Sequence, residues 1–266
     1  MFETMAQWPT LALVALGACF LTLVTFSTRA AVIRWTSKER QSDLIDLASS
    51  MNAPVGTTLA FLIGFAVSIT WGTMSAAQVA IEQVASSSQQ LSWLTLNLND
   101  QARANAINED VVRYLNTIVE QDRKVLPSGD IVELPSFNAL DQLERQIHQA
   151  AQGGSAVNPE VGPMLSAAAA LTGSQAQLNA VARRQLPSVV MWLLLFTATL
   201  SAAVMGIVAT KVRRPYLIVG WAFVAAIGIA VVLSLYSPFA GTVAVDFQPI
   251  SDASQRIQDG QQTLRR

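Results

Sequence analysis

The chain has 266 residues, of which 52% are hydrophobic and only 13% are charged, and its formal net charge is -1 at pH 7. Because an average soluble domain carries about 25% charged residues, this deficit indicates a membrane protein. The near-neutral charge argues against a nucleic-acid partner, which requires bulk positive charge. The single cysteine, Cys19, excludes an intrachain disulfide.

Four stretches are long and apolar enough to cross a bilayer, which takes about 20 mostly apolar residues. They run from Pro9 to Thr28, from Pro54 to Met74, from Leu186 to Thr210 and from Tyr216 to Tyr236, and none contains an acidic residue, a basic residue or a histidine. Tryptophans and tyrosines near their ends are typical of the boundary between membrane and water. The sequence therefore predicts four transmembrane helices, which we expect to form two hairpins.

Small residues recur every four positions along the second apolar stretch. They are Gly56, Ala60, Gly64, Ser68 and Gly72, and similar alanine-rich stripes occur in the third and fourth stretches. Small side chains let helix backbones approach closely in a membrane, where lipid offers no hydrophobic drive for association. The stripes therefore predict tight helix packing, either within a chain or between copies.

Larger apolar side chains are expected on the side of the second stretch opposite these small residues. They are Leu62, Phe65 and Ile69, with Phe61 near the edge of that side. Contact with lipid or with the protein core is one interpretation. The other is that they line a pore between subunits, where an apolar constriction can gate by dewetting. A proton-driven transporter usually needs an ionisable group within the membrane, and these stretches have none.

The polar segment from Gln78 to Gln185 is expected to lie outside the membrane. Apolar residues recur there at three- and four-residue spacings, which is typical of amphipathic helices. We expect one long helix to continue from the second stretch toward Leu126 and a second helix at Phe137–Gln152. A third, alanine-rich helix is expected to run from about Met164 into the third stretch. Together they predict a helical bundle.

These elements give an all-α fold class with four parts. Residues 1–77 form the first transmembrane hairpin, 78–185 the helical extramembrane domain, 186–236 the second hairpin, and 237–266 a C-terminal segment. The fold is thus an integral membrane protein with a helical bundle between its hairpins.

Basic residues concentrate in two short loops. The loop after the first stretch carries Arg29, Arg34, Lys38 and Arg40, and residues 211–214 carry three more between the third and fourth stretches. Because Lys- and Arg-rich loops normally face the cytoplasm, both loops are expected inside. Four spans then place the helical domain and both ends of the chain outside.

No residue pattern indicates an enzyme. The only histidine is His148, whereas zinc and di-iron sites need several His, Cys or carboxylate ligands at set spacings. Phosphate-binding loops, nucleophile elbows and zinc-protease motifs are also absent from the sequence. We therefore expect no catalytic residue, no metal and no cofactor.

The segment after the fourth stretch reads SPFAGTVAVDFQPISDA, from Ser237 to Ala253. Pro238 ends the helix, Gly241 permits a turn, and Phe239 is placed to anchor the exit of the chain. Apolar residues then alternate between Val243 and Phe247, which predicts a short extended segment along the bundle. This segment is either a rigid cap on the bundle or a gate or clasp between subunits.

The chain resembles the bacterial bestrophin-like membrane proteins, a family of unknown function. The resemblance rests on this segment, on the helical insert, and on LAFLIGFAVSITW (Leu59 to Trp71) and RRQLPSVVMWLLLF (Arg183 to Phe196). In that family a Pro-Phe-x-Gly element commonly follows the last span, and Pro238, Phe239 and Gly241 match it. Ser237 stands where the family often has an acidic residue.

The resemblance implies a function as well as a fold. Bestrophins proper, which are more distantly similar, are pentameric anion channels with apolar side chains of the second span narrowing the pore. The resemblance thus implies a homo-oligomeric, anion-selective channel in the lipid bilayer of the bacterial inner membrane. The alternative is a non-conducting scaffold, sensor or accessory subunit whose helical domain binds a protein partner. Bestrophins have this domain in the cytosol, whereas the basic loops predict a periplasmic one.

Overall fold

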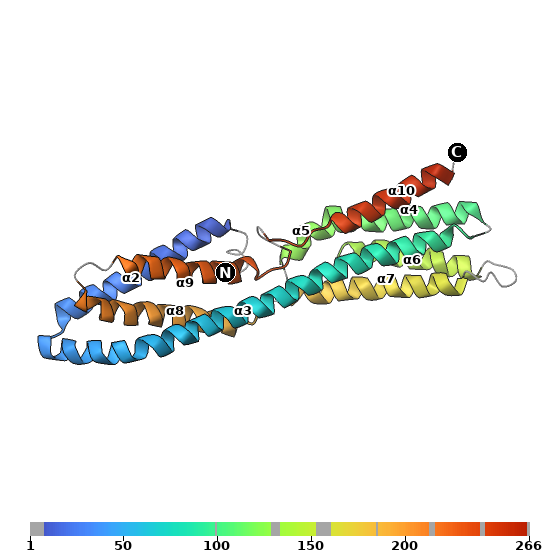
Figure 1. Ribbon diagram of the computed structural model, residues 1–266. Coiled ribbons are helices and arrows are strands. Elements are labelled where there is room, and N and C mark those ends of the chain that lie inside the picture. The colour runs from blue at the N-terminus through green and yellow to red at the C-terminus, as the bar shows by residue number, and fades with distance from the viewer. Residues whose placement is uncertain are drawn as a thin grey trace. The chain divides into compact units, whose positions relative to one another are not determined.

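The computed structural model describes residues 8–98, 100–128, 134–152, 161–184, 186–212, 216–239 and 243–264. Within these ranges the chain is helical and has no strand, which confirms the predicted all-α class. The elements, drawn in Figure 1, are α2 (Thr10–Trp35), α3 (Lys38–Thr95), α4 (Gln101–Thr117), the π-helical η1 (Ile118–Asp122), α5 (Arg123–Val125), the 3-10 helix η2 (Leu126–Ser128), α6 (Ser136–Gln152), α7 (Val161–Ala182), α8 (Ser188–Val208), the 3-10 helix η3 (Ala209–Lys211), α9 (Leu217–Ser234) and α10 (Gln248–Leu264).

Four of the described helices are long and apolar enough to cross a membrane. They are α2, α3, α8 together with η3, and α9, and each contains the central part of one predicted stretch. The prediction of four membrane-spanning helices is confirmed, while their pairing into two hairpins stays a prediction. At 58 residues, α3 is much longer than a hydrocarbon core of about 30 Å requires.

The chain divides into two compact units. Unit 1 comprises residues 1–72 and 185–243, and unit 2 comprises residues 73–184 and 244–266. Helix α3 therefore contributes its first part to unit 1 and its last part to unit 2. The two stretches predicted as hairpins fall mainly in unit 1, and the predicted helical domain falls mainly in unit 2.

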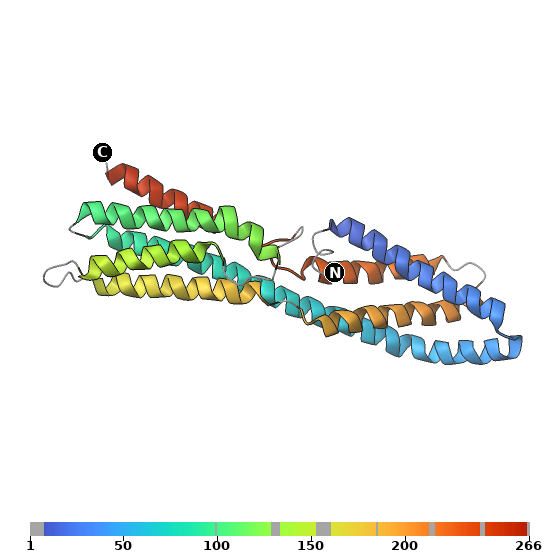
Figure 2. The ribbon, with the colours of Figure 1, turned by 180° about the vertical axis from the view of Figure 1, so that it is seen from behind.

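Unit 1 is built on α2, which packs against both α8 and α9, as Figure 2 shows. Its apolar core draws on all four spans and contains several alanines, among them Ala66, Ala198, Ala202 and Ala222. At Gly206 of α8 an added Cβ would lie 2.5 Å from the carbonyl oxygen of Thr25 in α2. The two backbones thus meet where only glycine fits, which is the packing mode expected of helices in lipid.

Unit 2 is a bundle in which α4 packs against α6 and α10, and α6 packs against α7. The amphipathic pattern buries one side of each helix, and its fully buried large side chains include Ile81, Leu91, Ile107, Leu115, Leu140, Leu143 and Ile147. The predicted helix at Phe137–Gln152 is confirmed by α6, which begins one residue earlier.

Two predicted helix continuations are wrong. The long helix from the second span ends at Thr95, and a new helix begins after Asp100, whose side chain accepts a hydrogen bond from the Arg103 amide at 3.2 Å. Asp100 is an ordinary N-cap. Because it is neither glycine nor proline, the absence of those two residues did not exclude a helix end there. The alanine-rich helix ends at Ala182 rather than entering the third span, because Pro187 begins a separate helix.

Candidate functional site

One side of α3 is exposed along its course through unit 1. Leu59, Leu62, Ala66 and Thr70 are buried and define the inner side of the helix. The opposite side carries no charge, because α3 has no Asp, Glu, Lys or Arg between residues 47 and 81. An uncharged outer surface of this kind suits contact with lipid or with another copy of the chain.

The four residues predicted to line a pore separate into two pairs. Phe61 is 67% exposed and Phe65 is 46% exposed, and their rings stack with centroids 6.2 Å apart and planes inclined by 10°. Leu62 is only 9% exposed. Ile69 is partly buried and packs against the core of unit 1. The structure therefore brings the two rings together on the outer side and turns the other two side chains inward.

The predicted stripe of small residues lies largely on this same outer side. Ala60, Gly64, Ser68 and Gly72 are exposed, and Gly56 is partly buried. A Cβ added at any of the three glycines would meet no atom within 4 Å. The sequence predicts Phe65 opposite the stripe and Phe61 near the edge of the opposite side, whereas in the structure both rings share the side of the stripe. The stripe stays a prediction of packing, and its open surface leaves room for lipid or for another helix.

The segment after the last span is described only in part. Pro238 and Phe239 are buried, and Gly241, the last residue of the predicted element, lies outside the described residues. In unit 2, Val245 and Phe247 are buried while Asp246 between them is exposed, as the predicted alternation requires. Val243, predicted on the same side as these two, is 41% exposed and departs from the pattern. The guanidinium carbon of Arg123 lies 5.8 Å from the centre of the Phe247 ring, a cation–π arrangement.

A polar network that the sequence did not reveal lies buried in unit 2. The Tyr114 hydroxyl donates to Oε1 of Gln175 at 2.6 Å, and Nε2 of Gln175 donates to Oγ of Ser136 at 2.7 Å. The Ser136 amide then donates to Oδ1 of Asp122 at 3.0 Å. Four elements, α4, η1, α6 and α7, supply these residues, so spacing in the sequence gives no signal of the network.

Asp122 ends the π-helical turn η1 and is fully buried. Burial raises the pKa of its carboxyl above the usual value, although hydrogen bonds from Ser136 and Gln175 oppose the shift. Burial also raises the pKa of Tyr114 well above 10, with a smaller contribution from the Asp122 charge. No local pattern signals this environment, because Asp122 lies among charged neighbours typical of a solvated helix face.

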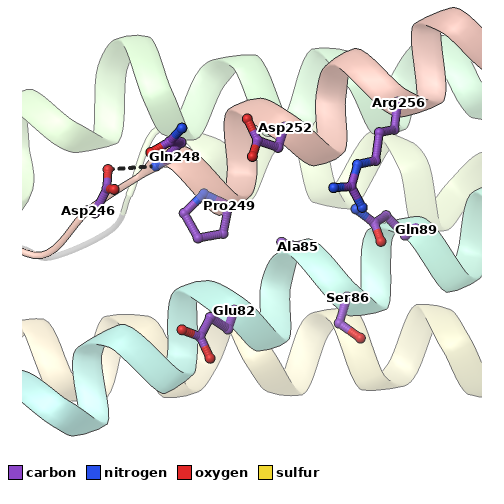
Figure 3. Close-up of a pocket in the computed structure, with 9 residues that line it drawn as sticks. All are labelled: Glu82, Ala85, Ser86, Gln89, Asp246, Gln248, Pro249, Asp252 and Arg256. Atoms are coloured by element: carbon purple, nitrogen blue, oxygen red, sulfur yellow. Dashed lines mark hydrogen bonds between the residues drawn. The ribbon is translucent and has the colours of Figure 1, made fainter.

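A polar pocket of about 510 Å³ lies between α3 and α10 within unit 2, as Figure 3 shows. Glu82 supplies a carboxyl group from the α3 side of the pocket. Asp246 and Asp252 supply two more from the α10 side, and Arg256 supplies one guanidinium. Asp246 accepts a hydrogen bond from the Gln248 amide at 2.9 Å, which caps α10. Across the described ranges, no group of three or more His, Cys, Asp or Glu is arranged to hold a metal ion.

Comparisons with known proteins agree with this architecture. The sequence matches the Bestrophin-like domain over residues 19–250. Two structures of a bacterial bestrophin homologue from Klebsiella pneumoniae, both single-residue variants, have a TM-score of 0.73. One is 13% identical and covers 92% of this chain and 98% of that one. The other is 15% identical and covers 92% and 97%.

A further crystal structure, described as a membrane protein variant, has a TM-score of 0.74 at 13% identity and covers 92% of this chain and 97% of that one. A comparison with curated proteins found no significant match. At such low identities the solved structures support the shared fold alone, whereas the domain match spans most of the sequence. The predicted resemblance is thereby confirmed, and the chain belongs to the Bestrophin-like family of membrane proteins.

Proposed function

We propose that this chain forms a homo-oligomeric ion channel whose path is lined by the outer side of α3. The observation that carries the proposal is the uncharged outer surface of α3 in unit 1. There the stacked rings of Phe61 and Phe65 lie beside glycines at which an added Cβ would meet no atom within 4 Å. Small residues permit close approach between copies, and exposed rings can narrow a path between them. Membership of the Bestrophin-like family supports this proposal.

The two rings are proposed as the narrow part of the path. An apolar constriction passes ions poorly when it is dry and conducts when it is wet, so small changes in its width can gate flow. Leu62 and Ile69 face the core of their own chain and would act behind the rings by supporting the helix.

The proposed permeant ions are anions. Cation channels commonly present rings of Asp or Glu side chains, and the part of α3 between residues 47 and 81 has none. We place the channel in the bacterial inner membrane. The distribution of Lys and Arg in the sequence favours a periplasmic helical domain, a placement that labelling of introduced cysteines would test.

The test is ion flux through liposomes that contain the purified protein, with empty liposomes as background. Chloride flux is expected to exceed potassium flux, and Phe65→Ala is expected to change the flux severalfold because it widens the narrow part. Phe196→Ala is the control, since Phe196 is also an exposed ring, at 65% against 46% for Phe65, but lies on α8. Equal effects of both substitutions would contradict the placement of the path. An oligomer that has no central path and passes no ions would overturn the channel.

The second candidate is a non-conducting scaffold, sensor or accessory subunit that binds a partner through unit 2. The pocket between α3 and α10 favours it, because the pocket is open and combines carboxyl groups with one guanidinium. A partner that binds there should be released by Arg256→Gln together with Asp252→Asn, while ion flux through liposomes should stay at background in every variant.

A further inference from the structure

Charged side chains are gathered at one end of unit 1. Among its described residues they are Arg29, Arg34, Lys38, Glu39, Arg40, Asp43, Asp46 and Lys211. All belong to the end of α2, the beginning of α3 or the end of η3. Five are basic and three acidic, so this end, which we call the basic end, carries net positive charge.

Two contacts between side chains and their partners show that these elements meet. Nη2 of Arg29 donates to the backbone oxygen of Val212 at 3.2 Å, and Nζ of Lys211 lies 3.1 Å from Oδ1 of Asp46. Both views in Figures 1 and 2 place the turn from α2 to α3 beside the end of α8. The guanidinium of Arg29 therefore lies next to the backbone that carries Lys211.

The packing of α2 against α8 fixes the position of Arg29. Close contact between Gly206 and Thr25 holds the last turn of α8 against α2. Arg29 follows Thr25 by one helical turn on the same side of α2. Its Nε is buried and so is not open to a ligand from outside, but the exposed contact with Val212 uses only one of the N–H donors on the two Nη atoms. The other Nη hydrogens can donate to an acceptor from outside the chain.

Lys211 is also able to take another partner. Its ion pair with Asp46 joins two side chains that are both more than half exposed. Exposed pairs of this kind contribute little to stability, because water and salt screen them. A doubly exposed lysine can therefore turn from Asp46 to a stronger acceptor at little cost.

Exposed rings and aliphatic side chains border the basic end. Trp35 ends α2 and is 81% exposed, and Tyr216 precedes α9 and is 73% exposed. Leu217, the first residue of α9, is 90% exposed. Tryptophan and tyrosine prefer the depth of lipid headgroups, and an exposed leucine beside them suits acyl chains. A ligand of the basic end is thus expected to have both a negative and an apolar part.

We infer that the basic end binds the phosphate of an anionic phospholipid, with Arg29 and Lys211 as its ligands. A guanidinium offers paired donors to two phosphate oxygens, and an ammonium adds a point charge. Basic pockets at the ends of transmembrane helices are a known setting for acidic headgroups. The net negative charge of the lipid matches the positive balance of the site, while its acyl chains cover Leu217. This inference does not depend on ion conduction.

The experiment uses the full chain, purified in detergent and stripped of lipid. Phosphatidylglycerol and phosphatidylcholine with identical acyl chains are added separately, and the thermal unfolding midpoint and the retained lipid are measured, the latter by native mass spectrometry. Phosphatidylglycerol is expected to raise the midpoint more and to stay bound. Glycerol phosphate, which has the headgroup chemistry but no acyl chain, is expected to raise the midpoint little.

The double variant Arg29→Gln with Lys211→Gln is expected to lose the advantage of phosphatidylglycerol over phosphatidylcholine. Lys124→Gln with Arg145→Gln removes the same charge from exposed positions of unit 2 and should keep that advantage. Lys211→Gln alone changes only an exposed side chain, so it folds even if the double variant does not, and it should lose part of the advantage.

Three outcomes would overturn the inference. The first is an undiminished preference for phosphatidylglycerol in Lys211→Gln and the double variant, and the second is equal stabilisation of the unchanged protein by both lipids. The third is a shift with glycerol phosphate as large as that with the lipid, because the site would then bind a free phosphate ester instead.

Discussion

The helices of the two units pack through different kinds of contact. Unit 1 uses small residues at the contacts between spans, and several of its described hydroxyls bond to carbonyls of their own helix, as Thr25 does to Leu21 at 2.8 Å. Unit 2 packs large aliphatic side chains around a buried network that joins Tyr114, Gln175 and Asp122 through Ser136.

The difference follows from the solvent that each unit is expected to meet. Lipid gives no hydrophobic drive between helices, so close backbone approach and dispersion must hold the spans together. Water supplies a hydrophobic drive roughly proportional to the apolar area buried, and that drive can offset the cost of burying a carboxyl group. Substitutions that change backbone distance should therefore affect unit 1 most, and substitutions that remove hydrogen bonds should affect unit 2 most.

The largest effect is expected for Gly206→Ala. The new Cβ would lie 2.5 Å from the carbonyl oxygen of Thr25 and 3.0 Å from Cβ of Thr28, so α2 and α8 must move apart. Overpacking of this kind lowers the free energy of unfolding by about 3 kcal/mol at the upper end of its usual range. The free energy of unfolding in detergent would measure it. Gly220→Ala is the control, because no atom lies within 4 Å of its added Cβ, and it should be neutral or slightly stabilising.

The second effect belongs to unit 2. Tyr114→Phe removes the hydroxyl that donates to Gln175 at 2.6 Å and leaves a buried acceptor without its partner. Losing this hydrogen bond lowers the free energy of unfolding by about 2 kcal/mol, because no water reaches the buried acceptor to replace the hydroxyl. Chemical denaturation at neutral pH would measure the change. Tyr216→Phe, at an exposed ring of unit 1, should leave stability unchanged. If both substitutions had the same effect, the contrast between the units would fail.

The sequence was sufficient to predict the spans and family but not this network. Four apolar stretches and the three- and four-residue spacing of α6 follow from local patterns, so they could be read directly. Asp122 has charged neighbours on its own helix, and its partners Ser136 and Gln175 come from α6 and α7. Only the assembled bundle brings these residues together, so no local spacing signals the contact.

The candidate site on α3 was predicted less completely. Phe61 and Leu62 are adjacent, so at about 100° per residue they cannot both face the same path squarely. The sequence alone does not say which side of the helix the core takes. That choice depends on contacts such as that of Ile63 with Gly228 of α9, where an added Cβ would lie 2.9 Å from the Ile63 side chain.

The third prediction concerns pH and again separates the units. Burial raises the pKa of Asp122 in the folded protein above the unfolded value of 3.8. Between these two values the folded state binds more protons than the unfolded state. This group therefore makes stability fall as pH rises through the window, and stability returns as pH falls toward 3.8.

Asp122→Asn removes this titration but keeps an oxygen for the Ser136 amide. The free energy of unfolding of the variant should therefore depend less on pH than that of the unchanged chain, between neutral pH and about pH 4. Denaturant titrations at several pH values would give both curves. The matched control is Asp141→Asn in the same unit, at an exposed carboxyl, and its curve should follow that of the unchanged chain. Parallel curves for Asp122→Asn and the unchanged chain would contradict the role assigned to burial.

The smallest effect is expected for the ion pair at the basic end of unit 1. Lys211 and Asp46 are 3.1 Å apart, and both side chains are more than half exposed, so their coupling should be about 0.2–1 kcal/mol. A double-mutant cycle with Lys211→Gln and Asp46→Asn isolates that term from the effect of each side chain alone. The coupling should shrink further in high salt, since screening weakens exposed pairs. Adding phosphatidylglycerol should also reduce it, because the bound phosphate draws Lys211 away from Asp46. A coupling that salt and lipid leave unchanged would mean that the pair is a fixed part of the fold, and Lys211 would then be unavailable to a headgroup.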